Sequence, residues 1–134
     1  GDTLDAAHAA GLSVTVGIWL GHGRHGFAYS DEQMVADQLA RVRETVIEYR
    51  DHPALLIWSL GNEMEGFEAG DNPKIWNAVN EAAALVKQLD PHHPTMTVTA
   101  EIVVNVSVMS TKYAMPSIFT GSTATAVRLH WLNG

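Results

Sequence analysis

Apolar residues follow two different spacings along this chain, and the spacings predict alternating helices and strands. In two long segments the apolar positions are separated alternately by four and three residues, which places them on one face of a helix. These stripes are Val35, Leu39, Val42 and Val46 in the first segment and Ile75, Val79, Ala82, Val86 and Leu89 in the second. We therefore expect two amphipathic helices that pack against an apolar layer.

Three further segments have the pattern of β-strands. Residues 12–20 and 95–100 are rich in β-branched side chains, which fit a pleated sheet well. Residues 54–60 are apolar at almost every position, which is typical of a strand with both faces covered. A short helix is expected before the first strand, because residues 6–10 are alanine-rich and Gly11 supplies a left-handed capping position.

Polar residues and prolines predict where the helices begin and end. Residues 30–33 (SDEQ) form a capping box, so Ser30 is expected to start the first long helix. Asn72 and Pro73 are expected as the N-cap and the first residue of the second. Pro53 and Pro91 follow the two helices, and the residue before a proline avoids helical geometry.

The resulting order is helix, strand, helix, strand, helix, strand, which predicts an α/β fold. Strands that alternate with helices need crossover connections and therefore lie parallel. Both an eight-stranded (β/α)8 TIM barrel and an open doubly wound sheet fit this order. A barrel takes about 250 residues, so this chain would supply about half of one, a partial barrel.

Composition and charge exclude several partners. Fifteen acidic residues against eight basic ones give a formal charge of −7, whereas a nucleic-acid partner requires a basic face. No apolar run approaches the roughly 18 residues of a membrane span. The chain has no cysteine, which excludes disulfides and thiolate metal sites. We expect no nucleic-acid partner, no membrane insertion and no cofactor.

The composition changes after residue 102. All fifteen acidic residues lie at or before Glu101, and only Lys112 and Arg128 are charged in residues 102–134. We expect residues 1–102 to form the folded unit and residues 103–134 to be an irregular, atypical tail. Two interpretations of the tail stay open: it is strand-rich or poorly ordered, or it is translated out of frame relative to the rest. The nucleotide sequence distinguishes them.

Asn62 and Glu63 directly follow the predicted strand 54–60. The carboxyl ends of parallel strands carry the ligand sites of both barrels and open α/β sheets. Glycoside cleavage needs a carboxylic acid that protonates the leaving oxygen and, in a retaining enzyme, later deprotonates water. Glu63 is the candidate for that group, and the Asn62 amide can hold a sugar hydroxyl. The alternative is that Glu63 only caps or pairs after a strand.

Three polar residues on the loop after the first strand, His22, Arg24 and His25, fall on the same edge of the sheet and are candidates to line a sugar pocket. Trp19 is close enough to this edge to stack on a sugar, whereas Trp58 is expected in the core. His22 and His25 have the spacing of a metal pair, but no third ligand lies nearby, so we predict no metal. Ordinary loop histidines are the alternative for both.

Residues 51–63 (DHPALLIWSLGNE) closely resemble the acid/base segment of glycoside hydrolase family 2. The resemblance covers residues 1–102 and implies the third to fifth strands of a TIM barrel. It implies a retaining β-glycosidase in which Glu63 is the general acid/base and Asn62 the adjacent sugar-binding amide. The implied partners are a β-glycoside substrate and the remainder of the barrel.

The chain departs from that family at the second carboxylate. The resemblance implies a nucleophilic Glu on the seventh strand, about 5–5.5 Å from the acid/base group. No acidic residue follows Glu101, and Glu65 and Glu68 are too close to Glu63 along the chain. We therefore expect the isolated chain to be inactive. A truncated remnant that only binds sugar is the first alternative.

A complete small open-sheet protein that binds an unrelated ligand is the second alternative. Residues 21–26 have the GxGxxG spacing of a dinucleotide-binding loop. However, the next predicted helix begins four residues too late, and no acidic residue follows at the end of a second strand. These two differences argue against a dinucleotide site.

Overall fold

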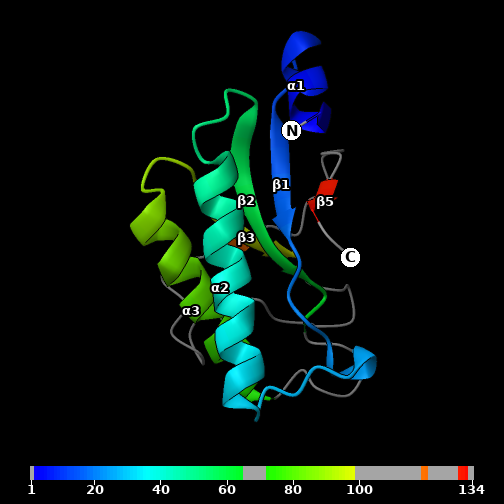
Figure 1. The fold of residues 1–134 in the computed structure, drawn as a ribbon, viewed down its shortest axis with the longest axis vertical. Helices are drawn as coiled ribbons and strands as arrows, with labels where there is room; N and C mark the ends of the chain where they lie inside the picture. The colour runs from blue at the N-terminus through cyan, green and yellow to red at the C-terminus, as the bar shows by residue number, and fades with distance from the viewer. Residues whose placement is uncertain (1, 65–71, 99–118, 121–129, 133–134) are drawn as a thin grey trace.

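The structure is a computed structural model and describes residues 2–64, 72–98, 119–120 and 130–132. The helices are α1 (Asp2–Ala9), the short 3-10 helix η1 (Gly23–His25), α2 (Glu32–Tyr49) and α3 (Pro73–Leu89), and the strands are β1 (Val14–Ile18), β2 (Leu55–Asn62), β3 (Thr95–Val98), β4 (Phe119–Thr120) and β5 (His130–Leu132). The predicted alternation of helices and strands over residues 2–98 is confirmed (Figure 1).

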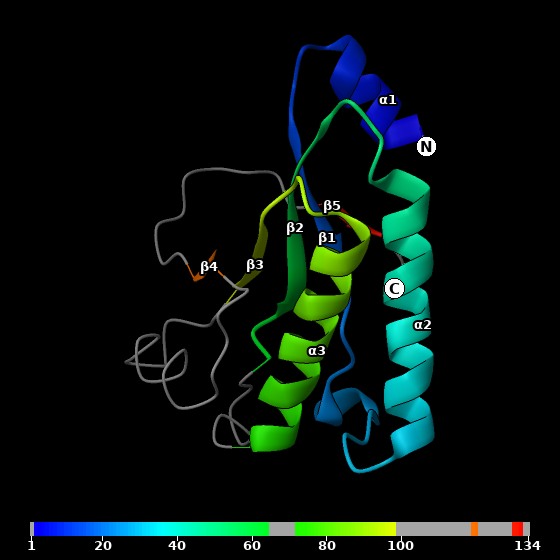
Figure 2. The same ribbon diagram turned by 90° about the vertical axis from the view of Figure 1, so that its left-hand side faces the viewer.

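The strands form one sheet in the order β4-β3-β2-β1-β5, and every neighbouring pair is parallel. The central strands β1, β2 and β3 therefore lie side by side in chain order. Figure 2 shows that α2 and α3, which connect them, both lie on one side of this sheet. A doubly wound sheet has helices on both faces, whereas a barrel has them all on the outside. The described strands are compatible with a partial TIM barrel.

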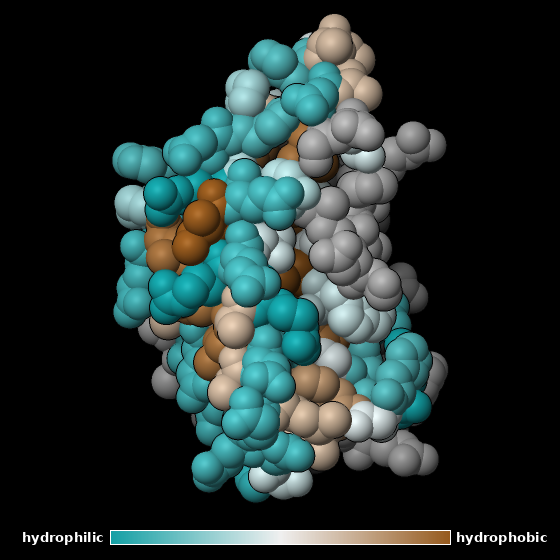
Figure 3. Space-filling view, in the orientation of Figure 1, coloured by the Kyte–Doolittle hydropathy of each residue, from teal (hydrophilic) through white to brown (hydrophobic). Residues whose placement is uncertain are grey.

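The core lies between this sheet and the two long helices. Val42 and Val46 of α2 are fully buried, and Trp58 of β2 and Trp76 of α3 are fully buried as well. The second predicted stripe is buried from Ile75 to Val86, and the remaining stripe residues, Val35, Leu39 and Leu89, are half-buried. The outer face of the helix layer is mostly hydrophilic with isolated hydrophobic patches (Figure 3). This pattern is the one expected of helices that pack through a single face.

The N-cap of α2 differs from the prediction by one residue. Asp31, not Ser30, caps the helix, because its carboxylate accepts hydrogen bonds from the backbone N–H groups of Gln33 at 3.0 Å and Met34 at 3.1 Å. A carboxylate also interacts favourably with the positive end of the helix dipole, an advantage that a serine hydroxyl lacks. At α3 the prediction is confirmed, since Asn72 accepts from the Lys74 N–H and Pro73 is the first helical residue.

The strand ends differ slightly from the predicted ones. β1 is confined to Val14–Ile18 within the predicted 12–20. β2 continues past the predicted residue 60, because Asn62 pairs with Val98 at the end of β3. The strand that carries the candidate site therefore stays hydrogen-bonded to its neighbour up to the residue before Glu63.

The carboxylate of Asp90, the residue after α3, is buried and connects the end of that helix to β2. Asp90, 3% exposed, accepts a 2.8 Å hydrogen bond from the indole Nε1 of Trp58. The same carboxylate accepts from the backbone N–H groups of His92 and His93, and the His93 ring Nδ1 lies 2.7 Å away. Four hydrogen-bonding contacts therefore satisfy a side chain whose burial would otherwise be costly.

The tail is described only at β4, which pairs with β3, and at β5, which pairs with β1. The other residues from 99 onward lie outside the described residues, as does Glu101, so the expectation for 103–134 stays a prediction. In the described part of the chain no helix is long and apolar enough to cross a membrane.

Candidate functional site

Asn62 and Glu63 lie at the carboxyl end of β2 and are both half-buried. Gly61 has a φ of +66° and Glu63 a φ of +50°, so the backbone leaves the strand through two left-handed residues. The Glu63 N–H donates a 2.8 Å hydrogen bond to the carbonyl of Val98. The candidate acid is thus held by the neighbouring strand at the edge where the sequence places it.

The left-handed conformation of Glu63 is unfavourable for a residue with a Cβ, by about 1–2 kcal/mol. Such conformations persist only where the surrounding structure imposes them, and they occur often at functional sites. Glu63 is the only described non-glycine residue with a positive φ. The strain therefore falls on the one residue that the sequence singles out as catalytic.

His22 brings the loop after β1 against this end of β2. Its side chain is 5% exposed, and the backbone of Asn62 lies close enough to raise the pKa of the ring, whereas the ring Nε2 has no hydrogen-bond partner among the described residues. Burial lowers the pKa of His22 below 6.5, and the charges of Arg24 and His25 lower it further, while Asn62 and Glu63 oppose the shift. The imidazole is therefore mainly neutral at neutral pH.

The side chains of Trp19, His22 and His25 form a cluster of rings on the loop that follows β1. The ring centres of Trp19 and His22 are 5.4 Å apart, those of Trp19 and His25 are 6.5 Å apart and nearly parallel, and those of the two imidazoles are 6.0 Å apart. The structure therefore brings together the three side chains that the sequence analysis assigns to sugar binding. Arg24 lies beside them on η1 and is exposed.

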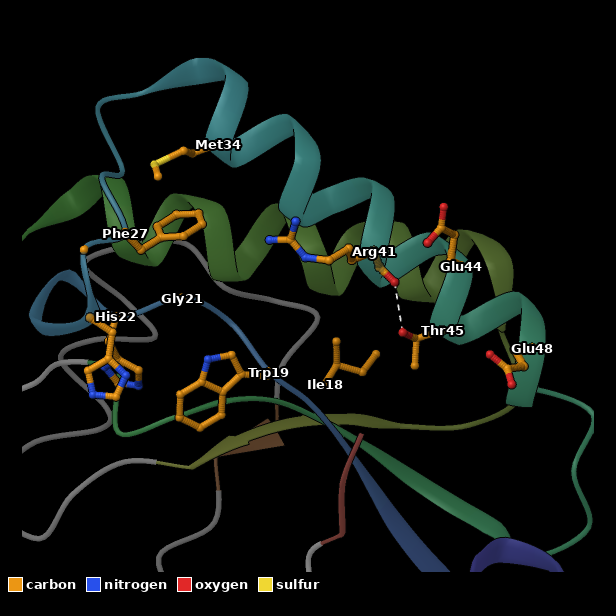
Figure 4. Close-up of a pocket in the computed structure, with 12 residues that line it drawn as sticks. Ile18, Trp19, Gly21, His22, Phe27, Met34, Arg41, Glu44, Thr45 and Glu48 are labelled. Atoms are coloured by element: carbon orange, nitrogen blue, oxygen red, sulfur yellow. Dashed lines mark hydrogen bonds between the residues drawn. The ribbon is translucent and has the colours of Figure 1, made fainter. Parts of the chain in front are cut away.

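A cavity of about 440 Å³ opens between this cluster and α2. Figure 4 shows Trp19 and His22 on one side of it and side chains of α2 on the other. The lining residues include Trp19, His22, His25, Met34, Arg41 and Glu44. Asn62 and Glu63 are not among its lining residues, so the cavity adjoins the predicted site through His22 but does not contain the candidate acid.

No three His, Asp or Glu side chains gather to form a metal site within the described segments. Glu65 and Glu68, the other acidic residues near the site in the sequence, lie outside those segments. Of these three acidic residues, Glu63 is therefore the one that the structure places.

Two residues that the sequence analysis missed contact the site loop. The Tyr29 hydroxyl donates to the carbonyl of Gly21 at 2.6 Å, and the Gly21 N–H donates to Oε1 of Gln38 at 2.7 Å. Gln38 is 1% exposed and belongs to the buried face of α2. Its position between Val35 and Val42 on the apolar stripe is the signal that could have identified it.

Parts of the chain are similar in sequence to fungal glycosidases. The chain is 35% identical over 69 residues to mannan endo-1,4-beta-mannosidase F of Aspergillus clavatus and 36% identical over 63 residues to a probable mannan endo-1,4-beta-mannosidase C of Aspergillus terreus. These matches cover 52% and 39% of this chain but only 16% of each relative. Residues 7–123 match the family model described as glycosyl hydrolases family 2, TIM barrel domain. The chain therefore belongs to the glycosyl hydrolases of family 2, as part of their TIM-barrel domain.

Proposed function

We propose that this chain carries the acid/base half of a retaining β-glycosidase site, with Glu63 as the general acid/base. The observation that carries the proposal is the place of Glu63, directly after β2 and bonded through its N–H to Val98 at the end of β3. Catalytic groups of TIM-barrel enzymes lie at this edge of the sheet. Family membership supports the same assignment.

In the proposed mechanism Glu63 first donates a proton to the oxygen of the departing group. After a glycosyl-enzyme intermediate has formed on a second carboxylate, the ionised Glu63 removes a proton from the attacking water. The Asn62 amide holds a hydroxyl of the sugar next to the reacting carbon. Trp19 supplies an apolar ring surface for the sugar, and the imidazoles of His22 and His25 supply polar contacts.

We propose a β-mannosidic linkage as the first substrate class to test. The two fungal relatives are named for their action on the 1,4-β linkages of mannan. Their similarity covers 16% of their own length, so the full set of their substrate contacts is not contained in the matched segment. Mannosides should therefore be compared with galactosides, glucosides and glucuronides.

We further propose that the isolated chain of 134 residues does not turn over substrate, because no acidic residue follows Glu101 to act as nucleophile. The test is hydrolysis of nitrophenyl β-glycosides by the purified chain, with Glu63→Gln as the control. We expect no hydrolysis above that of the control. Robust hydrolysis that Glu63→Gln abolishes would refute this proposal.

A chain without turnover can still bind sugar, and the ring cluster favours this second function. We expect manno-oligosaccharides to quench or shift the fluorescence of Trp19 in the wild-type chain. Four tryptophans contribute to the fluorescence, so the change is assigned to Trp19 if Trp19→Phe abolishes it and Trp58→Phe, which removes a buried indole, leaves it in place. If the change with sugar disappears with Trp58→Phe and persists with Trp19→Phe, the proposed sugar site is in the wrong place.

A further inference from the structure

Gly21 is held at both of its backbone groups by side chains that come from elsewhere in the chain. Its N–H donates to Oε1 of Gln38 on α2 at 2.7 Å, and its carbonyl accepts from the Tyr29 hydroxyl at 2.6 Å. Gly21 lies beyond the end of β1, where no strand partner supplies these bonds. Two side chains therefore fix the backbone immediately before His22.

The two side chains are well suited to this task. Burial raises the pKa of Tyr29 to about 12, although a hydrogen bond with Gln38 opposes the rise, so the hydroxyl stays protonated and donates at any ordinary pH. Gln38 is 1% exposed on an otherwise apolar helix face. A buried amide is costly unless it is hydrogen-bonded. The bond from Gly21 satisfies the Gln38 Oε1, whereas its Nε2 has no hydrogen-bond partner among the described residues.

His22, the next residue, transmits this fixed position to β2. The backbone of Asn62 raises the pKa of His22, so it interacts favourably with the protonated ring. A carbonyl oxygen is the backbone group that favours a protonated imidazole, so we infer that the Asn62 carbonyl faces the ring. That carbonyl and the N–H of Glu63 belong to the same peptide bond, and the N–H is bonded to Val98. The peptide before Glu63 is thus held from both sides.

We propose that Tyr29 and Gln38 are positioning residues for Glu63, which hold Gly21 so that His22 stays against the peptide bond between Asn62 and Glu63. Neither residue touches the reacting atoms. A role of these contacts in catalysis rests on the proposed function of Glu63. The coupling of Tyr29 and Gln38 to the peptide before Glu63 does not depend on that function. A catalytic group must be held within about 0.5 Å of its working position, and second contacts of this kind provide that precision.

The test follows the ionisation of His22 by NMR in the full chain, labelled with 15N throughout and with 13C at histidine. The His22 signal is assigned by its loss in His22→Gln. In the wild type we expect His22 to titrate below pH 6.5. We also expect the amide signal of Glu63 to shift with the same midpoint, because the carbonyl of its peptide bond interacts with the imidazole.

Tyr29→Phe and Gln38→Met each remove one bond to Gly21. Burial is the largest influence on the pKa of His22 and outweighs the opposing effect of Asn62, so a loosened loop should move the His22 midpoint back toward 6.5. The Glu63 amide should lose its dependence on that midpoint. The matched controls are Tyr49→Phe and Gln33→Met, which change the same residue types on α2 away from Gly21. In the controls both signals should stay as in the wild type.

Three results would overturn the proposal. The first is a wild-type Glu63 amide that does not follow His22. The second is a lower melting temperature in Tyr29→Phe and Gln38→Met with both signals unchanged, as a purely structural role predicts. The third is an equal change in the controls. Tyr29→Phe removes a single hydroxyl and decides the question alone if Gln38→Met does not fold. Hydrolysis is not measured, so the outcome is independent of whether Glu63 is catalytic.

Discussion

The backbone N–H of Glu63 and the carbonyl of Val98 are joined by a 2.8 Å hydrogen bond. This bond continues the parallel pairing of β2 with β3 past Asn62, although the backbone of Glu63 has already left the strand conformation with a φ of +50°. The contact and the strain occur at the same residue. The neighbouring strand therefore helps to impose the conformation that Glu63 alone would avoid.

Replacement of Glu63 should reveal the strain in its left-handed backbone conformation. Glycine adopts left-handed φ values without a Cβ penalty, so Glu63→Gly should have a free energy of unfolding about 1 kcal/mol higher than Glu63→Ala. Urea denaturation of the two variants measures this difference. The strain is then a cost that the proposed catalytic residue imposes on the fold.

The control for this prediction is the same pair of substitutions at Glu44, an exposed residue within α2. In a helix glycine is less favourable than alanine by about 1 kcal/mol, so the order of the two variants should reverse. An identical order at both positions would show that the backbone of Glu63 is not strained.

Loss of the Asp90 carboxylate should destabilise the fold. Asp90→Asn weakens charged hydrogen bonds from Trp58 and His93, and we expect a loss of about 2 kcal/mol at neutral pH. The control Asp51→Asn removes an exposed carboxylate that pairs with Arg50 at 3.5 Å, and it should change the free energy of unfolding by less than about 1 kcal/mol. Urea denaturation compares the two.

The contribution of Asp90 should also depend on pH. Burial raises the pKa of Asp90, but the hydrogen bonds from Trp58, His93 and His92 outweigh it and hold the pKa below 3.8. A depressed carboxyl pKa stabilises the fold above the unfolded-state value and loses that effect as the pH falls through the folded-state value. The difference between wild type and Asp90→Asn should therefore shrink below pH 3.8. A constant difference down to acid pH would argue against a charged Asp90.

His22 should produce acid destabilisation in a higher pH range. Its folded-state pKa is lowered from 6.5, mainly by burial, so the unfolded chain binds the proton more readily. The stabilising effect of a neutral His22 is complete above pH 6.5 and decreases as the pH falls toward the folded-state pKa. Denaturation at about pH 7.5 and 5.5 should show a drop in the wild type that is smaller in His22→Gln. His92→Gln, an exposed control, should keep the full drop.

Gly21 should tolerate no side chain. A Cβ there would overlap the ring of Phe27, whereas a Cβ at Gly23 meets nothing within 4 Å. Displacing a packed ring costs about 1–3 kcal/mol, so Gly21→Ala should lower the melting temperature and Gly23→Ala should leave it nearly unchanged. Equal melting temperatures for the two variants would show that the loop before His22 is not tightly packed.

Local signals in the sequence were sufficient for the helices α1, α2 and α3 and the strands β1, β2 and β3, but not for η1, β4 and β5. Asn72 and Pro73 define the start of α3 because capping depends on neighbouring backbone groups alone. The one-residue error at Asp31 arose because serine and aspartate are both good caps, and the choice depends on which oxygen reaches two N–H groups. Strand order and the common side of both helices required the structure, since either α/β arrangement has the same pattern along the chain.

The position of the site was predictable, but its supporting contacts were not. Asn62 ends an apolar strand and Glu63 follows it, which is enough to place them at the carboxyl edge. The burial of His22 depends on tertiary contacts with Trp19 and Asn62 that no spacing encodes. Gln38 was a visible exception on an apolar stripe, and such an exception predicts a buried hydrogen bond without identifying its partner.

The role of Glu63 is tested most directly in a complete family 2 barrel in which residues 2–98 of this chain replace the matching segment. Glu63→Ala is assayed with glycosides of a poor leaving group, phenol, and a good one, dinitrophenol, with and without azide. Loss of a general acid should lower kcat/KM by roughly 10²–10⁴-fold for the phenyl glycoside but little for the dinitrophenyl glycoside. The variant also lacks the base that activates water, so azide should restore turnover of the dinitrophenyl glycoside and yield a β-glycosyl azide. Equal losses for both leaving groups, without rescue by azide, would contradict the assignment of Glu63 as the acid/base.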